Sequence, residues 1–284
     1  MSTGLMAGRR GVVMGVANDH SIAWGIAKRL SEAGAELAFT YQTEQLAKRV
    51  LPLAKSIGSD FVLPCDVGLR PDDASPLSLN SAFKVLAQRW ATIDFVVHAI
   101  AFSDKNELKG RYADTTRDNF THTMLISCFS FTEVAKAAAP LMKNGGALIT
   151  LTYGGSVRVM PNYNVMGVAK AALEASVRYL AADFGDDNIR VNAISAGPVR
   201  TLAGSGVSDA RLMFNYQKRN APLKRTVTIE EIGNTAVYLL SDMGSAVTGE
   251  IHYVDSGYNI MAMPRLSELK AVEAGEARDT EAAE

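Results

Sequence analysis

Two side chains that can act together in acid–base chemistry lie seven residues apart, at Tyr163 and Lys170. Seven residues are nearly two turns of an α-helix, so both side chains can point from one face. A tyrosine has a reference pKa of about 10, and a nearby ammonium group favours its ionised form and orients it. The pair suits a catalytic donor and its partner, although the same spacing also fits an interfacial aromatic beside a solvated lysine.

A phosphate-binding loop is the second feature with chemical meaning. The first strand pattern is followed by Gly15 and a polar loop, and then by Ser21, Ile22 and Gly25 at the start of a helical pattern. The common Gly-x-Gly-x-x-Gly motif is absent, yet free amides and a hydroxyl at a helix N-terminus suit a pyrophosphate group. We expect Gly25 to let this helix pack closely on the sheet. An ordinary N-cap serine and a packing glycine are the alternative.

Two further strand ends carry side chains that fit the adenosine half of a dinucleotide. Gln42 follows the second strand pattern, and its amide can donate to and accept from ribose hydroxyls. The first Lys or Arg after Gln42 is Lys48, which favours NADH over NADPH, since a 2′-phosphate is usually met by a cation. Asp66 and Val67 follow the third strand pattern and can flank the adenine, with Asp66 accepting from its amino group. An ordinary turn aspartate is the alternative.

The elements that must position these residues are short apolar runs alternating with amphipathic stretches. The predicted strands are Gly11–Val16, Leu37–Tyr41, Phe61–Pro64, Phe95–Ile100, Ala147–Leu151, Val191–Ser195 and Ile251–Val254. The predicted helices are Ile22–Ala33, Glu44–Ile57, Ser81–Trp90, Thr116–Met142, Val165–Phe184 and Ile229–Ser241. Nearly continuous apolar strands alternating with helices predict an α/β fold: one doubly wound parallel sheet of about seven strands, with helices on both faces.

Three segments interrupt this alternation. Residues 69–80 are rich in Pro, Ser and Asp and are predicted to form a surface loop. Residues 197–220 contain several glycines and are predicted to form a lid over the substrate. Residues 265–284 contain six acidic and three basic side chains, and we expect a tail that is partly disordered. No linker divides the rest, so we expect one domain over residues 1–264.

The composition of the 284-residue chain excludes several classes of protein. The 29 Lys and Arg nearly balance the 30 Asp and Glu, which gives no general attraction to nucleic acid or to an anionic membrane. No apolar run approaches the roughly 18 residues that span a bilayer, and no signal peptide is evident. Cys65 and Cys128 do not form a disulfide pattern, and the four histidines are scattered. We therefore expect a cytoplasmic protein without a metal site.

Several motifs together are similar to those of the short-chain dehydrogenase/reductase family, and within it to the bacterial enoyl-acyl-carrier-protein reductases. They are Ser21-Ile-Ala-Trp-Gly25, Ala35-Glu-Leu-Ala-Phe-Thr-Tyr-Gln42, Asn162-Tyr-Asn-Val-Met-Gly167, Arg190-Val-Asn-Ala-Ile-Ser-Ala-Gly-Pro198, Gly197-Pro-Val-Arg-Thr-Leu202 and Arg225-Thr-Val-Thr-Ile-Glu230. The resemblance covers residues 8 to about 264 and implies a Rossmann-like fold. Ordinary members carry Tyr-x-x-x-Lys with a serine thirteen residues earlier; here those positions are Met166 and Tyr153, and the active tyrosine is Tyr163.

The resemblance also assigns roles to individual side chains. Tyr163 and Lys170 would form the catalytic core, with Tyr153 as a second tyrosine lining the thioester site. The nicotinamide end of the cofactor would meet Ile100, Lys170, Val199, Thr201, Leu202 and Ala203. The acyl chain would meet Ala101, Phe102, Ser103, Met166, Ala203 and Val207. His98 invites a catalytic interpretation, but we expect a packed histidine at a strand end.

The implied activity is reduction by NADH of the trans-2 double bond of an enoyl thioester on acyl carrier protein, in fatty acid synthesis. Tyr163 would donate to the thioester oxygen, and Lys170 would hold the nicotinamide ribose. A carbonyl reductase or alcohol dehydrogenase of the same fold is one alternative, and a non-catalytic nucleotide-binding regulator is another.

The resemblance implies a tetramer with a two-fold contact through helices 116–142 and 165–184. Their small residues allow a close approach. They are Ala135, Ala137, Ala138, Ala171, Ala172 and Ala175.

A group of basic residues near the predicted lid is suited to steering an acidic carrier protein, with a solvated basic face as the alternative. It consists of Arg211, Lys218, Arg219, Lys224 and Arg225.

Overall fold

The computed structural model describes residues 4–199, 210–264, 266, 269 and 270. Within these residues, seven strands form one sheet in the order β3-β2-β1-β4-β5-β6-β7, and every neighbouring pair is parallel. The strands are β1 (Arg10–Met14), β2 (Glu36–Tyr41), β3 (Val62–Pro64), β4 (Phe95–His98), β5 (Gly146–Thr152), β6 (Ile189–Ala196) and β7 (Ile251–Val254). The predicted doubly wound α/β sheet is confirmed.

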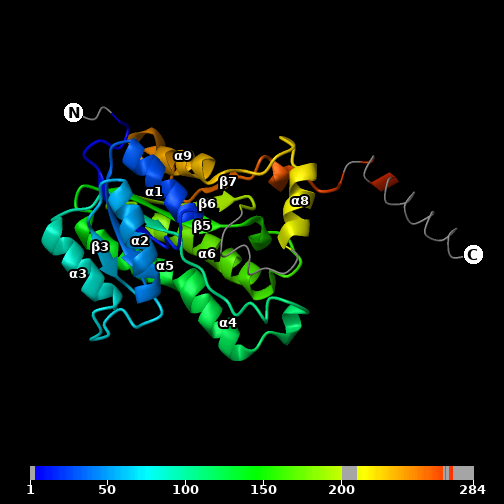
Figure 1. Cartoon of the computed structure of the whole chain (residues 1–284), viewed down its shortest axis with the longest axis horizontal. Helices are drawn as coiled ribbons and strands as arrows, with labels where there is room; N and C mark the ends of the chain where they lie inside the picture. Colours follow the sequence, from blue (N-terminus) through cyan, green and yellow to red (C-terminus); the bar gives the residue numbers. More distant parts are fainter. Residues whose placement is uncertain (1–3, 200–209, 265, 267–268, 271–284) are drawn as a thin grey trace, which may run out of the picture.

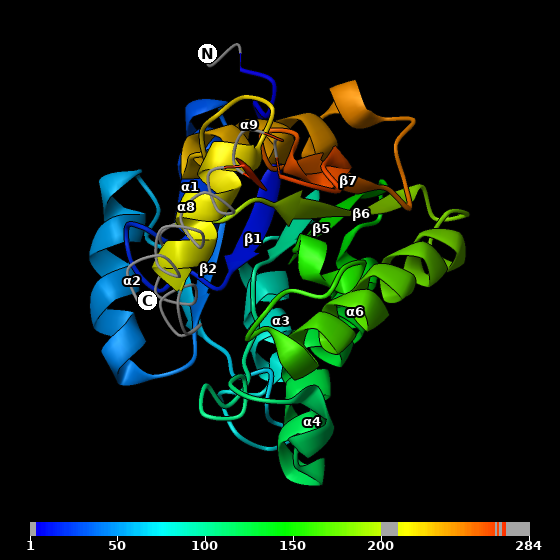
Figure 2. The same cartoon turned by 90° about the vertical axis from the view of Figure 1, so that its right-hand side faces the viewer.

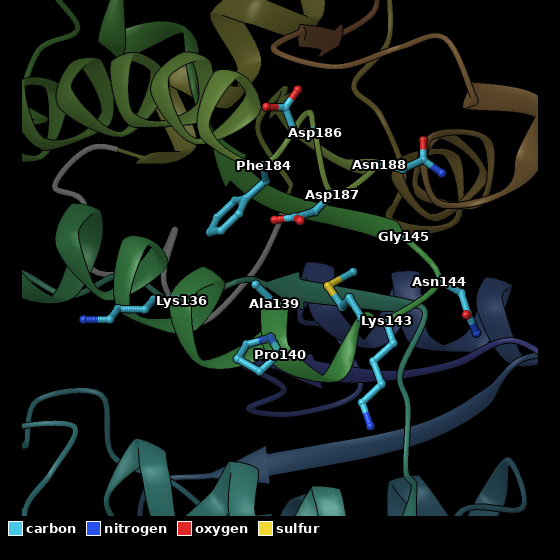
Figure 3. A pocket seen from close by; sticks show the side chains of 11 residues that line it. Lys136, Ala139, Pro140, Lys143, Asn144, Gly145, Phe184, Asp186, Asp187 and Asn188 are labelled. Carbon is cyan, nitrogen blue, oxygen red and sulfur yellow. The ribbon is translucent and has the colours of Figure 1, made fainter.

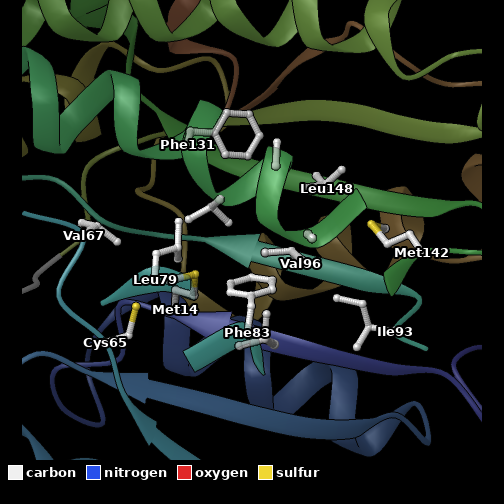
Figure 4. Close-up of a cluster of buried hydrophobic side chains, with 14 of the residues drawn as sticks. Met14, Cys65, Val67, Leu79, Phe83, Ile93, Val96, Phe131, Met142 and Leu148 are labelled. Carbon is white, nitrogen blue, oxygen red and sulfur yellow. The ribbon is translucent and has the colours of Figure 1, made fainter. Parts of the chain in front are cut away.

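Helices cover both faces of the sheet, as Figures 1 and 2 show. One face carries α1 (Ile22–Glu32), α2 (Glu44–Ser56) and α9 (Ile229–Leu240). The other carries α3 (Leu79–Arg89), α5 (Ser130–Ala138) and α6 (Asn164–Asp183). Each layer closes its own apolar core against the strands, and the core beneath α3, α5 and α6 is drawn in Figure 4. Strands buried from both sides need apolar residues at successive positions, as β4 has from Phe95 to Val97.

The helix predicted over residues 116–142 differs in the structure. It consists of α4 (Arg117–Met124), a π-helical turn at Leu125–Phe129, α5, and a 3-10 turn at Ala139–Leu141. Within the π-helical turn, the carbonyl of Ile126 accepts a hydrogen bond of 2.7 Å from the hydroxyl of Ser130. Apolar periodicity predicts a helix but does not reveal a local change to π-helical bonding, and such turns frequently occur at functional sites.

The continuous helical stretch Arg117–Leu141 is long and apolar enough to cross a membrane by length and composition. Core helices pass the same test, and this stretch packs on the sheet. Phe131, Val134 and Ala138 are fully buried in the core beneath α5. We therefore interpret this stretch as part of the protein core.

Two predicted loops also contain helical structure. Residues 69–78 form the expected turns, but α3 begins at Leu79, where the hydroxyl of Ser78 accepts from the amide of Ser81. Within the predicted lid, α8 spans Ala210–Asn220, while residues 200–209 lie outside the described part of the chain. The start of α9 is better marked in the sequence, because Thr228 and Glu231 form a reciprocal capping box.

The turn after β1 brings two strand ends into contact. Gly15 has a φ of 100°, and a Cβ there would lie 2.1 Å from the carbonyl oxygen of Ala99, just beyond β4. A side chain at this position would therefore be strained and would also collide with backbone.

We predict that Gly15→Ala lowers the free energy of unfolding by about 3 kcal/mol, because left-handed strain and overpacking add. Gly58→Ala is the matched control, since Gly58 has a φ of 81° and nothing within 4 Å of its Cβ position. That variant should lose only about 1 kcal/mol, from strain. Denaturant unfolding measures both, and equal losses would contradict the close approach at Gly15.

Candidate active site

The predicted site residues follow the carboxyl ends of the strands. In a parallel sheet these ends lie along one edge, and ligands bind where the strand order reverses, here between β1 and β4. The residues concerned are Gly15 after β1, Gln42 after β2, Asp66 after β3, Ile100 after β4, Tyr153 after β5 and Val199 after β6. The fold thus brings the predicted cofactor and catalytic positions to one edge.

Tyr153 and Tyr163 form an edge-to-face pair, with ring centroids 5.2 Å apart and planes at 75°. Tyr163 immediately precedes α6, between Asn162 and Asn164, whose φ angles are 58° and 36°. Asparagine tolerates this left-handed conformation better than most residues. The side-chain amide of Asn164 also donates to the carbonyls of Leu108 and Gly110, at 3.1 and 3.2 Å. These features fix the turn that presents Tyr163.

Glycine is required beside Tyr163. A Cβ at Gly155 would lie 2.5 Å from the Tyr163 ring, and one at Gly167 would lie 2.8 Å from the carbonyl oxygen of Gly155. The turn after β5 and the first turn of α6 therefore approach too closely for larger side chains. This approach lets the two tyrosines meet.

Lys170 lies within α6 and is only 5% exposed. Its Nζ donates a hydrogen bond of 2.8 Å to the carbonyl of Leu151 in β5. Burial lowers the pKa of Lys170 to about 8, while Cys128 and Glu174 act in the opposite direction. The lysine is therefore a buried group that titrates close to physiological pH, unlike the solvated lysine of the alternative interpretation.

The pKa of Tyr163 is dominated by burial rather than by the expected effect of the ammonium group. Burial raises the pKa of Tyr163 well above its ordinary value, and Tyr153 and Glu174 raise it further. The phenol is therefore neutral, and it is able to donate a hydrogen bond. The effect of the Lys170 ammonium on Tyr163 therefore stays a prediction, because burial dominates this pKa and spacing alone does not reveal burial.

Tyr153 has a partner that the sequence analysis missed. Gln217 in α8 is buried, and its Nε2 donates to the Tyr153 hydroxyl oxygen at 2.5 Å. Burial raises the pKa of Tyr153, and this hydrogen bond lowers it. The bond ties the described part of the predicted lid to the second tyrosine. Gln217 stands in a polar stretch of sequence that resembles a solvated helix, so no local signal marks it.

The residues expected to line the acyl site differ in their accessibility. Ala101 and Phe102 are exposed, and Ser103 is half-buried and bonded through its hydroxyl to Asn119 at 3.3 Å. The backbone of Phe102 exchanges two hydrogen bonds with the Ser127 hydroxyl, at 2.9 and 2.8 Å. Met166 is buried and packs in a small apolar cluster that includes Tyr163. The remaining predicted positions, Thr201, Leu202, Ala203 and Val207, lie outside the described residues.

At the phosphate end, Ser21 precedes α1 as its N-cap residue. Its hydroxyl donates to the carbonyl of Asn18 at 2.7 Å and makes no capping bond to the helix. Gly25 was expected to let α1 pack on the sheet, and this expectation was wrong. A Cβ at Gly25 would lie 2.5 Å from the Cβ and from the carbonyl oxygen of Ile229. Gly25 thus allows α1 to pack on α9 rather than on the sheet. Ile22 is half-buried beside Ser21.

At the adenosine end, Gln42 is exposed at the end of β2. Asp66 is half-buried, and one carboxylate oxygen accepts from the amide of Gly68 at 2.8 Å, as an ordinary turn aspartate does. The second oxygen leaves capacity for an external donor. Val67 packs in the core beneath α3.

His98 is a packed residue, as expected. Its Nδ1 lies 3.1 Å from the Thr150 hydroxyl and its Nε2 lies 2.9 Å from the Ser130 hydroxyl. Burial, and then the charge of Lys170, lower the pKa of His98 to about 3, so the ring is neutral.

Cys65 and Cys128 are buried free thiols. In the part of the chain that the structure describes, no three metal-binding side chains are grouped.

A surface hollow of about 660 Å³ lies away from these residues, between the ends of α5 and α6 (Figure 3). It is lined by residues 136–145, which precede β5, and by residues 184–188, which precede β6. Those are the amino ends of the strands. The hollow is therefore at the edge of the sheet opposite the tyrosines and Lys170, and we assign it no part in their chemistry.

A parallel sheet in this order, with a tyrosine and a buried lysine at its carboxyl edge, defines a reductase fold of the short-chain dehydrogenase type. A profile of the enoyl-(acyl carrier protein) reductase family matches residues 15–259. This match spans most of the chain, and so the chain belongs to the enoyl-(acyl carrier protein) reductase family.

Individual relatives agree with this assignment. Enoyl-[acyl-carrier-protein] reductase [NADH] 2 of Rhizobium meliloti (strain 1021) is 68% identical over 271 residues, which are 95% of this chain and 99% of that protein. The crystal structure of FabI from Candidatus Liberibacter asiaticus is 61% identical, with a TM-score of 0.88, over 92% of this chain and 99% of that one. An enoyl-(acyl-carrier-protein) reductase from Anaplasma phagocytophilum, in complex with NAD, is 56% identical with a TM-score of 0.87, over 94% and 100% of the two chains.

The lowered pKa of Lys170 predicts a specific dependence of stability on pH. The unfolded lysine, with a pKa near the ordinary value of 10.5, binds a proton that the folded lysine releases above about 8. Lys170 therefore contributes a free energy of unfolding that rises with pH between about 8 and 10.5.

Lys170→Met should remove this contribution. Denaturant unfolding at several pH values gives the difference in unfolding free energy between wild type and variant, which should increase from pH 8 to 10.5. Using the difference cancels the other titrating groups. A difference that stays constant over that interval would show that Lys170 titrates as an ordinary solvated lysine.

Proposed function

We propose that this chain is an NADH-dependent enoyl-[acyl-carrier-protein] reductase that reduces the trans-2 double bond of enoyl thioesters in fatty acid synthesis. The observation that carries the proposal is the pair of Tyr153 and Tyr163 in contact, with buried Lys170 on α6 and buried Met166 at the position of the ordinary family tyrosine. Membership of the enoyl-(acyl carrier protein) reductase family supports it. The names of the relatives point to the same activity and to NADH.

The residues present fit a dinucleotide. The amino end of α1 and the hydroxyl of Ser21 suit the pyrophosphate, and Gln42 and Asp66 suit the adenosine. Ile100 and Val199, which are half-buried at the ends of β4 and β6, would flank the nicotinamide. Lys170 would donate to the nicotinamide ribose. The cofactor supplies the hydride that is added to the β-carbon of the enoyl thioester.

The chain's own contribution to the reaction centres on Tyr163. Hydride addition at the β-carbon develops negative charge on the thioester oxygen, and a neutral phenol can donate a hydrogen bond to it. Preorganised donors of this kind are usually the largest catalytic contribution. Tyr153 lines the same site, and its hydrogen bond from Gln217 connects it to α8. We propose that α8 helps to cover the acyl chain; the rest of the predicted lid, residues 200–209, lies outside the described residues.

A carbonyl reductase of the same fold is the second candidate, since fold alone does not determine the reaction. It would normally use a tyrosine at position 166 and a serine at position 153. NADH oxidation with crotonyl and acetoacetyl thioesters separates the candidates. Turnover of the crotonyl thioester is expected, whereas turnover of the acetoacetyl thioester alone, or NADH binding with no turnover, would overturn the proposal.

Tyr163→Phe keeps the ring and removes the hydroxyl group. We predict that it lowers kcat by about 100-fold or more while NADH binds with nearly unchanged affinity, since one oxyanion donor is lost. Tyr179→Phe is the matched control, because Tyr179 lies on α6 but is 76% exposed. Stopped-flow turnover and fluorescence titration measure the two quantities. A Tyr163→Phe enzyme with nearly full kcat would contradict the catalytic assignment.

Acyl carrier protein is the proposed partner, and the structure reduces the set of basic residues available to it. Arg225 pairs with Glu231 at 2.6 Å, and the ammonium of Lys224 donates to the carbonyl of Arg219 at 2.5 Å. The exposed side chains of Arg211, Lys218 and Arg219 on α8 are better placed to attract an acidic carrier. We assign this encounter to the cytoplasm, in keeping with two buried free thiols.

We also propose a homotetramer, built on the exposed sides of α4 to α6. Ala135 and Ala138 are fully buried against the sheet, so these two do not contribute to a contact between subunits. Ala171 is exposed, and so are larger apolar side chains nearby, including Phe129 at 51% and Val168. Exposed apolar surface of this kind commonly marks an interface.

Light scattering at micromolar concentration is expected to give four times the 30.4 kDa mass of one chain. A monomer under these conditions would contradict the assembly. This outcome would leave the assignment of the catalytic residues unchanged.

A further inference from the structure

A buried carboxylate lies one helical turn beyond Lys170, and the mechanism above does not use it. Glu174 in α6 is only 5% exposed. One of its carboxylate oxygens accepts a hydrogen bond of 2.6 Å from the hydroxyl of Thr152. Ionised carboxylates are rarely buried this deeply without a compensating partner, because removing their hydration is costly. The position therefore needs a physical reason.

The contacts of Glu174 continue those of Lys170. Lys170 donates to the carbonyl of Leu151, and Glu174 accepts from the hydroxyl of Thr152, the next residue of β5. Two residues one turn apart on α6 thus hold two consecutive residues at the end of β5. The following residue is Tyr153, which leaves the strand to meet Tyr163. The pair of hydrogen bonds fixes the point from which the second tyrosine enters the site.

Glu174 is one of the groups whose charge acts on Lys170. The groups that act on it electrostatically come from several packed elements: His98 from β4, Cys128 from the π-helical turn, and Glu174 from its own helix. His98 is neutral, and burial raises the pKa of Cys128, so that thiol is also neutral. Tyr163 from the turn before α6 is a neutral phenol, and burial likewise raises the pKa of Tyr253 on β7. Glu174, one helical turn from Lys170 on α6, is the remaining group that raises the pKa of Lys170.

We propose that Glu174 is a positioning residue of the reductase: its carboxylate places a negative charge one helical turn from Lys170 and, through Thr152, holds the end of β5 that carries Tyr153. The inference rests on the proposed function, because the role of Lys170 is to bind the nicotinamide ribose. Glu174 itself touches neither substrate nor cofactor. It acts through the two residues that do.

Glu174→Gln separates the charge from the packing, since the glutamine retains nearly the same volume and an oxygen that can accept from Thr152. Without the carboxylate, the pKa of Lys170 should fall by about one unit. NADH affinity should fall with rising pH as Lys170 loses its proton, and we call this part of the pH profile the alkaline limb. In Glu174→Gln the alkaline limb should move to lower pH by the same amount. We expect nearly wild-type affinity at pH 6.5 and affinity about five- to tenfold weaker than wild type at pH 8.5. Fluorescence titration of the full chain with NADH from pH 6 to 9.5 measures this directly.

Asp183→Asn is the matched control, because Asp183 is an exposed carboxylate on the same helix, and its alkaline limb should stay in place. An unshifted limb in Glu174→Gln would overturn the proposal. Affinity reduced equally at both pH values would also overturn it, because a purely structural loss has that signature. If the wild-type chain fails to bind NADH at any pH, the proposed function fails instead.

Thr152→Val tests the second half of the proposal and does not depend on the folding of the Glu174 variant. It keeps the carboxylate but removes its hydrogen-bond donor at the end of β5. We expect kcat to fall about tenfold, with the alkaline limb of NADH binding unmoved or at higher pH. Unchanged kcat would overturn the positioning role of the bond between Thr152 and Glu174.

Discussion

The hydrogen bond from the Lys170 ammonium to the Leu151 carbonyl is the interaction on which the rest of the site depends. It places a cation inside the protein, where desolvation opposes charge, at the edge of the sheet where the strand ends converge. The surroundings are consistent with this constraint. His98, which would otherwise add a second positive charge, is kept neutral between two hydroxyl groups. Glu174, which raises the pKa of Lys170, lies one turn away on α6.

A second consequence concerns the tyrosines. Tyr163 packs on α6 and is partly buried, and burial opposes its phenolate form as it opposes the ammonium of Lys170. The same environment therefore yields a lysine that is easier to deprotonate and a tyrosine that is harder to deprotonate. Such a tyrosine suits the donation of a hydrogen bond to an oxygen whose charge develops during the reaction. A proton already lost to solvent would be of no use for that purpose.

Much of this arrangement could be predicted from the sequence. All seven strands were placed within two residues at each end, because strands buried on both faces leave continuous apolar runs. The spacing of Tyr163 and Lys170, and the motifs around them, located the two tyrosines and the lysine. The packed role of His98 was also anticipated, because histidine is often partly buried.

The features that could not be predicted depend on contacts between distant segments. The π-helical turn at Leu125–Phe129 has the same apolar residues as a regular helix. Gln217 is 64 residues from Tyr153, and only the fold shows that α8 brings the two together. Glu174 follows Lys170 by four residues, and its sequence position predicts an ordinary solvated charge on a helix. In the structure it is buried. The depth of burial, which determines the direction of each pKa shift, is a property of the assembled layers.

The claim that Tyr163 is a neutral donor in the resting protein can be measured directly. Ionisation of a phenol increases absorbance near 295 nm, and subtracting the titration of Tyr163→Phe from that of the wild type isolates this one residue. The account predicts no difference between the two titrations from pH 6 to about 10, the ordinary pKa of tyrosine. A difference that develops near neutral pH would show that Tyr163 is a phenolate stabilised by Lys170, and would contradict the account.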